Sequence, residues 1–239
     1  MKSILITGAS AGIGRATAEH FLAKGWCVGL LARNIAPLEE IAAGQAGAVV
    51  LPCDVTDASA VEAAFKEFMG KAGRLDVLFN NAGSFGTAAP IDELPLEAWH
   101  AAVDVNLNGM FYAARAAFGE MRAQSPQGGR IINNGSVSAH APRENAVSYT
   151  VTKHAITGLT KALSLDGRSL DIACGQIDIG NARTALLEEL AANTPDNPPP
   201  MMDVRHVAEA VYIMATLPLE ANVQFMTLMA TKMPYTGRG

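Results

Sequence analysis

Residues 7–14 read Thr7-Gly8-Ala9-Ser10-Ala11-Gly12-Ile13-Gly14 and follow directly on the apolar run Ile4–Ile6. An apolar run that leads into closely spaced glycines is typical of a strand that turns tightly into a helix. The free backbone N–H groups at the start of such a helix, together with the helix dipole, attract phosphate groups. The stretch therefore predicts a strand–loop–helix unit that opens an α/β fold and holds a dinucleotide.

The glycines of this loop have separate expected roles. Gly8 permits the tight turn, Gly12 lets the backbone approach a pyrophosphate, and Gly14 lets the helix pack on the strand. Their spacing is Gly-x-x-x-Gly-x-Gly rather than the commoner Gly-x-Gly-x-x-Gly. With Ser10 and Ile13, they form the expected phosphate-binding loop.

Short apolar runs recur along the chain, mostly without the alternation of half-exposed strands. They are Ile4–Ile6, Cys27–Leu31, Ala48–Leu51, Val77–Phe79, Ile131–Ile132, Ile172–Cys174 and Phe225–Met229. Such runs indicate a sheet that is covered on both faces. Windows with helical character lie between several of them, at residues 61–69, 107–121 and 148–165. We therefore expect an α/β fold: a doubly wound, Rossmann-type parallel sheet of about seven strands with helices on both faces.

Length and charge narrow the class of protein. The 239 residues suit one domain, expected to span residues 1–239. The net charge is −5 and no run of Lys or Arg is present, so nucleic acid is not an expected partner. No stretch approaches 18 apolar residues, so no membrane-spanning helix is expected.

Cysteine and histidine usage argues against a metal site. Cys27, Cys53 and Cys174 are far apart and form no CxxC pair, and the five histidines are scattered. We expect buried thiols in a reducing compartment. The short apolar run near the start of the chain leads into the glycine loop rather than a cleavage site, so a cytoplasmic location is expected by elimination.

Residues at the end of the second predicted strand are expected to contact the 2′ position of the cofactor's ribose. An acidic residue about 20 positions past the glycine loop would bind the 2′-hydroxyl of NAD. This chain has Arg33, 19 residues after Gly14, followed by Asn34. A guanidinium there can hold a 2′-phosphate through charge-assisted hydrogen bonds, which favours NADP(H) over NAD(H). The alternative is a solvated surface arginine.

Tyr149 and Lys153 stand at i and i+4 of a predicted helix and therefore on one face. A neighbouring positive charge favours the phenolate form of a tyrosine, which makes it a usable acid/base. Tyrosine and lysine at this spacing are common on helix surfaces, so the pair by itself is weak evidence.

Two further polar residues strengthen that interpretation. Ser136 lies 13 residues before Tyr149, just past the strand at Ile131–Ile132, where strand ends open onto the ligand crevice of such a sheet. Its hydroxyl could position a substrate oxygen. Asn106 is expected to begin another helix, and its alternative role is that of a simple helix cap.

Together these motifs resemble the short-chain dehydrogenase/reductase family over nearly the whole chain. The resemblance implies an oxidoreductase that moves a hydride between a nicotinamide and a ketone or secondary alcohol, with a 3-oxoacyl thioester as one candidate substrate. It implies a catalytic tetrad of Asn106, Ser136, Tyr149 and Lys153. Lys153 would also bind the nicotinamide ribose, and Asn106 would hold a water of the proton relay.

The resemblance also implies contacts to the adenosine half of the cofactor. Asp54-Val55 looks like the family's adenine-contacting pair, and Asn80-Asn81-Ala82-Gly83 looks like its Asn-Asn-Ala-Gly signature. The cofactor residues expected from this signature are Asn80, Ala82 and Gly83.

One motif departs from the family. Members usually carry Pro-Gly-x-x-x-Thr after the sixth strand, and this chain has Cys174-Gly175-Gln176-Ile177-Asp178-Ile179 there. Ile177 can offer its backbone to the cofactor, but Ile179 has no hydroxyl. We expect Asn181 or Thr184 to take over the contact to the nicotinamide amide, with Asn181 favoured. The alternative is that Asn181 only caps the next helix.

The prolines at 195, 198, 199 and 200 exclude a helix there and predict a loop over Ala191–Met202. We expect a mobile substrate flap around residues 181–202. The apolar residues expected to line the substrate pocket are Leu186, Leu187, Leu190, Met201 and Met202.

Two other classes of protein could share this fold. A catalytically silent NADP(H) sensor or interaction module could share the fold, but it would not need all four tetrad residues. An epimerase or dehydratase of the extended relatives would need a separate substrate domain, which 239 residues do not provide. The resemblance further implies a homotetramer or dimer formed through the helices at residues 107–123 and 148–165.

Overall fold

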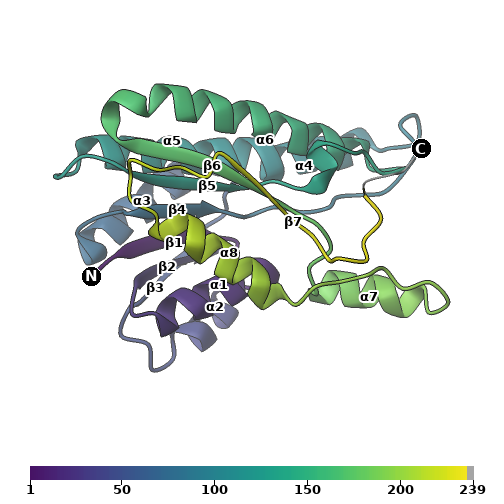
Figure 1. Cartoon of the computed structure of the whole chain (residues 1–239), viewed down its shortest axis with the longest axis horizontal. Coiled ribbons are helices and arrows are strands. Elements are labelled where there is room, and N and C mark those ends of the chain that lie inside the picture. Colours follow the sequence, from purple (N-terminus) through teal and green to yellow (C-terminus); the bar gives the residue numbers. More distant parts are fainter. Residues whose placement is uncertain (236–239) are drawn as a thin grey trace.

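The computed structural model describes residues 1–235, so residues 236–239 of the expected domain lie outside it. Strands and helices alternate along the chain (Figure 1). The strands are β1 (Ser3–Thr7), β2 (Cys27–Ala32), β3 (Ala48–Pro52), β4 (Val77–Asn80), β5 (Gly129–Asn134), β6 (Ile172–Ile179) and β7 (Phe225–Leu228). The helices are α1 (Gly12–Ala23), α2 (Ile35–Ala42), α3 (Ala58–Ala72), α4 (Leu96–Val103), α5 (Gly109–Ala123), α6 (Val147–Asp166), α7 (Ala185–Asn193) and α8 (Val204–Thr216), with short helical turns η1 (Asp104–Asn108), η2 (Val137–Ala139) and η3 (Arg168–Leu170).

All seven strands are parallel and form one sheet in the order β3-β2-β1-β4-β5-β6-β7. The predicted fold class is therefore confirmed. The strand order reverses direction between β1 and β4, and ligands of such sheets bind outside the carboxyl ends of the strands at that point.

Each face of the sheet is covered by a separate apolar layer, which explains the uninterrupted apolar strands. Side chains of one strand alternate between the layers, so Ile4 and Ile6 face one side and Leu5 faces the other. Helices α1, α2 and α8 cover the first face, while α3 and α5 pack on the second and α6 contacts β6 (Figure 1).

Two elements differ from the sequence expectation. Strand β6 continues to Ile179, five residues past the predicted end at Cys174. The predicted helix at 107–121 does not begin at Asn106, because α4, η1 and α5 follow one another without a break and η1 is a π-helical turn. No helix within residues 1–235 is long and apolar enough to cross a membrane.

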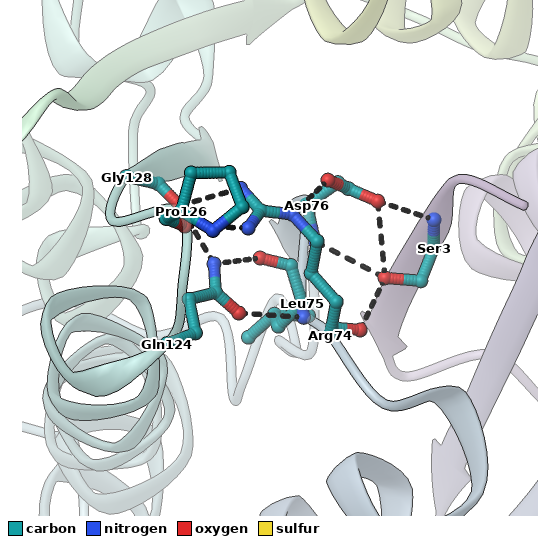
Figure 2. Close-up of polar contacts among 7 residues, drawn as sticks. All are labelled: Ser3, Arg74, Leu75, Asp76, Gln124, Pro126 and Gly128. Carbon is teal, nitrogen blue, oxygen red and sulfur yellow. Dashed lines mark hydrogen bonds and ion pairs between the residues drawn. The ribbon is translucent and has the colours of Figure 1, made fainter.

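The amino ends of β1 and β4 are joined by a closed polar network (Figure 2). The Asp76 carboxylate accepts from the Ser3 backbone N–H at 2.8 Å and from Arg74 Nε at 2.6 Å. The Arg74 guanidinium also donates to the carbonyls of Pro126 and Gly128. The Gln124 amide binds both backbone groups of Leu75, so that β1, β4 and the turn before β5 are tied together.

Candidate active site

A cleft of about 740 Å³ lies at the carboxyl ends of the strands around the switch point between β1 and β4. Its lining includes most of the residues predicted from the sequence: Gly8, Ser10, Gly12, Ile13, Arg33, Asn34, Asp54, Val55, Ala82, Gly83, Ser136, Tyr149, Lys153, Ile179 and Asn181. Four of the predicted catalytic and cofactor-binding residues do not line it: Gly14, Asn80, Asn106 and Ile177. The structure therefore brings the predicted loop and three of the four predicted catalytic residues to one cavity.

The glycine loop has the backbone that only glycine adopts without strain. Gly8 and Gly12 have φ values of +69° and +54°. A Cβ added at Gly14 would lie 2.1 Å from the Gly8 carbonyl oxygen, so the close approach of helix and strand requires glycine there. The cradle leaves backbone N–H groups open at the start of α1, which fits a pyrophosphate.

The segment Asn80–Gly83 lies next to the glycine loop and is hydrogen-bonded to Thr7, the last residue of β1. The backbone N–H groups of Asn81 and Ala82 donate to Thr7 Oγ1 at 2.8 and 2.9 Å, and Asn81 Nδ2 donates to the Thr7 carbonyl. Asn80 was expected at the cofactor, but its buried amide instead donates to the Met110 carbonyl at 2.7 Å. Its side chain therefore holds α5 against the sheet.

The end of β2 supplies the charged part of the cleft. The Arg33 side chain is 77% exposed, and its Nη1 lies 3.9 Å from Asp54 Oδ2. This long contact leaves most N–H donors of the guanidinium open to a ligand. Cys53 also lines this end, and burial raises the pKa of its thiol to about 11, so it remains a neutral thiol near pH 7.

The first turns of α6 place the phenol and the ammonium together. Lys153 is buried, and its Nζ donates to the Asn134 carbonyl at 2.7 Å, at the end of β5. The same Nζ lies 5.5 Å from the centroid of the Tyr149 ring. The Tyr149 ring in turn packs against Phe85, with ring centroids 5.0 Å apart.

Ser136 is fixed by a buried carboxylate that the sequence analysis missed. Its backbone N–H donates to Asp178 Oδ1 at 3.0 Å, while its hydroxyl oxygen accepts from the Ser138 N–H at 3.1 Å. The hydroxyl hydrogen therefore remains available to a ligand. Asp178 is fully buried and also contacts His140 Nε2 at 2.8 Å. The available signal was an acidic residue within an apolar segment.

Asn106 lies behind the cleft rather than on its wall. Its Oδ1 accepts from the Ser84 N–H at 2.7 Å and its Nδ2 donates to the Ser84 carbonyl at 2.8 Å. The interpretation of Asn106 as a helix cap is wrong, because it lies in the π-helical turn between α4 and α5. Such turns often occur at functional sites, and here the turn holds the wall segment at Gly83 and Ser84.

The longer β6 corrects the expected departure after the sixth strand. Gly175 lies inside the strand, and the Ile177 carbonyl accepts from the Gly135 N–H, so the Ile177 carbonyl already has a partner within the sheet. The family's Gly-x-x-x-Thr spacing then falls on Gly180 and Thr184. Thr184 lines the cleft, and its methyl carbon lies 3.3 Å from the place a Cβ would take on Gly12. The motif is therefore displaced from the expected Gly175–Ile179, and Thr184 is one of the two residues expected to take over the contact.

Asn181 does not cap the helix that follows it, so that alternative is also wrong. Helix α7 begins at Ala185 with Thr184 as its N-cap residue, and no side-chain capping bond is formed. The Asn181 Oδ1 instead accepts from Arg143 Nη2 at 3.1 Å. Arg143 lines the cleft and was not predicted from the sequence.

The expected apolar pocket is formed only in part. Leu186 and Leu187, at the start of α7, line the cleft. Leu190, Met201 and Met202 do not, and Met202 packs against the apolar layer of α1 and α8. Among residues 1–235, no group of three His, Cys, Asp or Glu side chains could hold a metal ion.

The chain is similar to known oxidoreductases. A family profile described as short chain dehydrogenase matches residues 2–195. The 3beta-hydroxysteroid dehydrogenase of Mediterraneibacter gnavus is 37% identical over 199 residues, which cover 80% of this chain and 70% of that protein. The L-fucose dehydrogenase of Oryctolagus cuniculus is 33% identical, covering 82% and 68%.

A solved oxidoreductase structure is also similar to this chain. The 3-ketoacyl-(acyl-carrier-protein) reductase from Brucella melitensis, complexed with NADH, superposes with a TM-score of 0.87 at 26% identity, covering 95% of this chain and 96% of that one.

Proposed function

The chain belongs to the short-chain dehydrogenase/reductase family, whose members act on CH–OH and C=O groups with nicotinamide cofactors, and we propose that it interconverts a ketone and a secondary alcohol with NADP(H). The observation that carries the proposal is the meeting of the glycine cradle with Ser136, Tyr149 and Lys153 at one cleft.

In the direction of reduction, the carbonyl carbon gains a hydride and the carbonyl oxygen gains a proton. A bound nicotinamide supplies the hydride. Tyr149 gives its phenolic proton to the oxygen, and the Ser136 hydroxyl holds that oxygen in place. The Lys153 ammonium, 5.5 Å from the ring centroid, stabilises the phenolate that forms. In the direction of oxidation, the same groups act in reverse.

The cofactor preference rests on the end of β2. Arg33 and Asn34 offer donors where a 2′-phosphate would lie, and Asp54, the only carboxylate among the described residues that line the cleft, is 3.9 Å from Arg33. A guanidinium recognises a phosphate by paired hydrogen bonds as well as by charge, which supports NADP(H) over NAD(H).

Further residues that line the cleft would contact the adenosine half of the cofactor, its nicotinamide amide and the substrate. Asp54, Val55, Ala82 and Gly83 would hold the adenosine half, and Thr184, in place of Asn181, would bind the nicotinamide amide. Asn106 would act through the Ser84 wall and a water of the proton relay. The apolar side chains of Phe85, Leu186 and Leu187 would pack against a hydrophobic part of the substrate. A 3-oxoacyl thioester belongs in the test panel as one candidate.

Helix α7 and the loop after it would close over the bound substrate. No residue of α7 is buried, and the helix stands away from the body of the molecule (Figure 1). Leu186 and Leu190 expose 60% and 45% of their surface, apolar area that closure could cover. Amide exchange should therefore slow in residues 185–202 when cofactor and substrate bind, and equal protection in both states would contradict a flap.

Helices α5 and α6 would form the contact between subunits of a tetramer or dimer. Large apolar side chains stand exposed on both: Phe111 on α5, and Val151 and Leu165 on α6. Light scattering would measure the mass in solution, and a monomer at micromolar concentration would contradict this assembly.

A panel of ketones and secondary alcohols, followed at the nicotinamide absorbance with NADPH and NADH, tests the proposed reaction. Turnover that is faster with NADPH is expected. Tight NADPH binding without turnover of any member would instead favour the catalytically silent sensor.

A further inference from the structure

Arg143 is a charged residue of the cleft that the proposed reaction does not use. It lies in the loop between η2 and α6, six residues before Tyr149. Its Nη2 donates to Asn181 Oδ1 at 3.1 Å, which links this loop to the segment after β6. Asn181 is only 7% exposed and also lines the cleft. The guanidinium is therefore held at the cavity wall by a fixed neutral acceptor.

Arg143 has no acidic partner among the described residues. Most other arginines of the chain pair with a carboxylate; these are Arg15, Arg33, Arg74, Arg115, Arg183 and Arg205. The hydrogen bond to Asn181 uses one of the five N–H donors of the guanidinium, and the rest remain open to a ligand.

The charge of the cleft is opposite to that of the chain. The chain has 23 acidic and 18 basic residues, yet the described residues lining the cleft include Arg33, Arg143 and Lys153 and one carboxylate, Asp54. Arg33 and Asp54 are close together at the end of β2, and Lys153 is bound to Asn134. Lys153 and Arg143 therefore have only neutral partners among the described residues, and of the two only Arg143 has no part in the proposed reaction.

We propose that Arg143, oriented by Asn181, binds a carboxylate of the substrate, so that the substrates are oxo acids and the corresponding hydroxy acids. The proposal rests on the proposed function for the reacting carbonyl. One guanidinium balances one negative charge, and its planar pair of N–H groups matches the two oxygens of a carboxylate. Leu186, Leu187 and Phe85 would contact the carbon chain between the carboxylate and the carbonyl.

Matched pairs of oxo acids and their methyl esters, with spacers of different length, test this assignment. Wild-type protein with NADPH is expected to have a higher kcat/KM for the acid of at least one pair. Arg143→Met is expected to lower the acid-to-ester ratio of kcat/KM roughly 10- to 100-fold, the usual effect of losing one charged hydrogen-bonded contact, whereas Arg143→Lys keeps part of the ratio. Arg168→Met, which removes an exposed arginine of η3 outside the cleft, leaves the ratio unchanged.

A binding measurement separates this inference from the proposed reaction. Calorimetry with the NADP⁺ complex compares straight-chain carboxylic acids with the amides of the same length. The wild-type protein should bind the acid more tightly, and Arg143→Met should abolish that difference while cofactor affinity remains within about twofold.

The possible results distinguish the carboxylate site from the proposed reaction. Equal turnover of acids and esters by the wild-type protein supports hydride transfer and overturns the carboxylate site. Arg143-dependent binding of acids without turnover of any compound keeps the site and overturns the proposed reaction. Tighter binding of an alkyl phosphate than of the matching carboxylate, or a loss of NADP⁺ affinity in Arg143→Met, also overturns the assignment.

Discussion

The two ends of the same parallel sheet both carry polar side chains, but they differ in what those side chains bind. At the amino end, Ser3, Arg74, Asp76 and Gln124 bind one another and nearby backbone groups (Figure 2). At the carboxyl end, the side chains around the cleft keep donors that no described residue uses, as Arg143 does with a single hydrogen bond.

Because of this difference, the amino end of the sheet should contribute mainly to folding stability and the carboxyl end mainly to ligand binding and catalysis. A hydrogen bond between two protein groups contributes to folding, whereas a donor left facing a cleft contributes to the binding of whatever fills it. Substitutions at the amino end should therefore change the free energy of unfolding with little effect on catalysis, and substitutions at the carboxyl end should do the reverse.

The strongest test at the carboxyl end is Tyr149→Phe. The change removes only the oxygen that transfers the proton, so kcat should fall ~10²–10⁴-fold with nearly unchanged cofactor affinity and melting temperature. Steady-state kinetics, NADPH titration and a thermal melt measure the three quantities. More than about a tenth of wild-type turnover would exclude Tyr149 as the acid/base.

The matching test at the amino end is Asp76→Ala. It leaves the Ser3 N–H and the Arg74 guanidinium without their carboxylate, and hydrogen bonds to charged groups are worth about 1.5–3 kcal/mol. Urea unfolding should show that loss, while KM for NADPH changes less than twofold. Glu220→Gln, at an exposed acid with no hydrogen bond among the described residues, is the control. An unchanged unfolding midpoint in Asp76→Ala would remove the distinction between the two ends.

A smaller effect is expected for Arg33→Ala. Loss of the charged contact to a 2′-phosphate should weaken NADPH binding by about 1.5–3 kcal/mol, nearer the lower value because the side chain is 77% exposed. NADH affinity should hardly change, since NADH has no 2′-phosphate. Titration of both cofactors at two salt concentrations checks this, and equal losses for the two would show that Arg33 does not read the 2′ position.

The smallest effect should distinguish two neighbours on the segment after β6. Thr184→Ala should weaken NADPH binding several-fold, because the proposed hydrogen bond between its hydroxyl and the nicotinamide amide is lost. Asn181→Ala should leave NADPH affinity nearly unchanged, because its side chain binds Arg143. If Asn181→Ala weakens NADPH binding more than Thr184→Ala does, the assignment of the nicotinamide contact to Thr184 is wrong.

The sequence by itself determined the features that depend on neighbours along the chain. Seven apolar runs predicted the seven strands, because a strand that is covered on both faces is mainly apolar. The spacing of Tyr149 and Lys153 fixed their common face, since one helical turn separates them. The glycine loop was likewise readable, because the φ values of Gly8 and Gly12 are local requirements.

Only the tertiary structure decided the features that depend on distant partners. Strand β6 was predicted too short because Gln176 and Asp178 are polar, and a polar residue in a buried strand is acceptable only when it has partners. Those partners are Thr160 on α6 and Ser136 after β5, which the sequence does not place beside it. Arg143 and Asn181 meet across 38 positions for the same reason. The register of parallel strands, and with it the loops after them, is set by packing of the whole sheet rather than by local spacing.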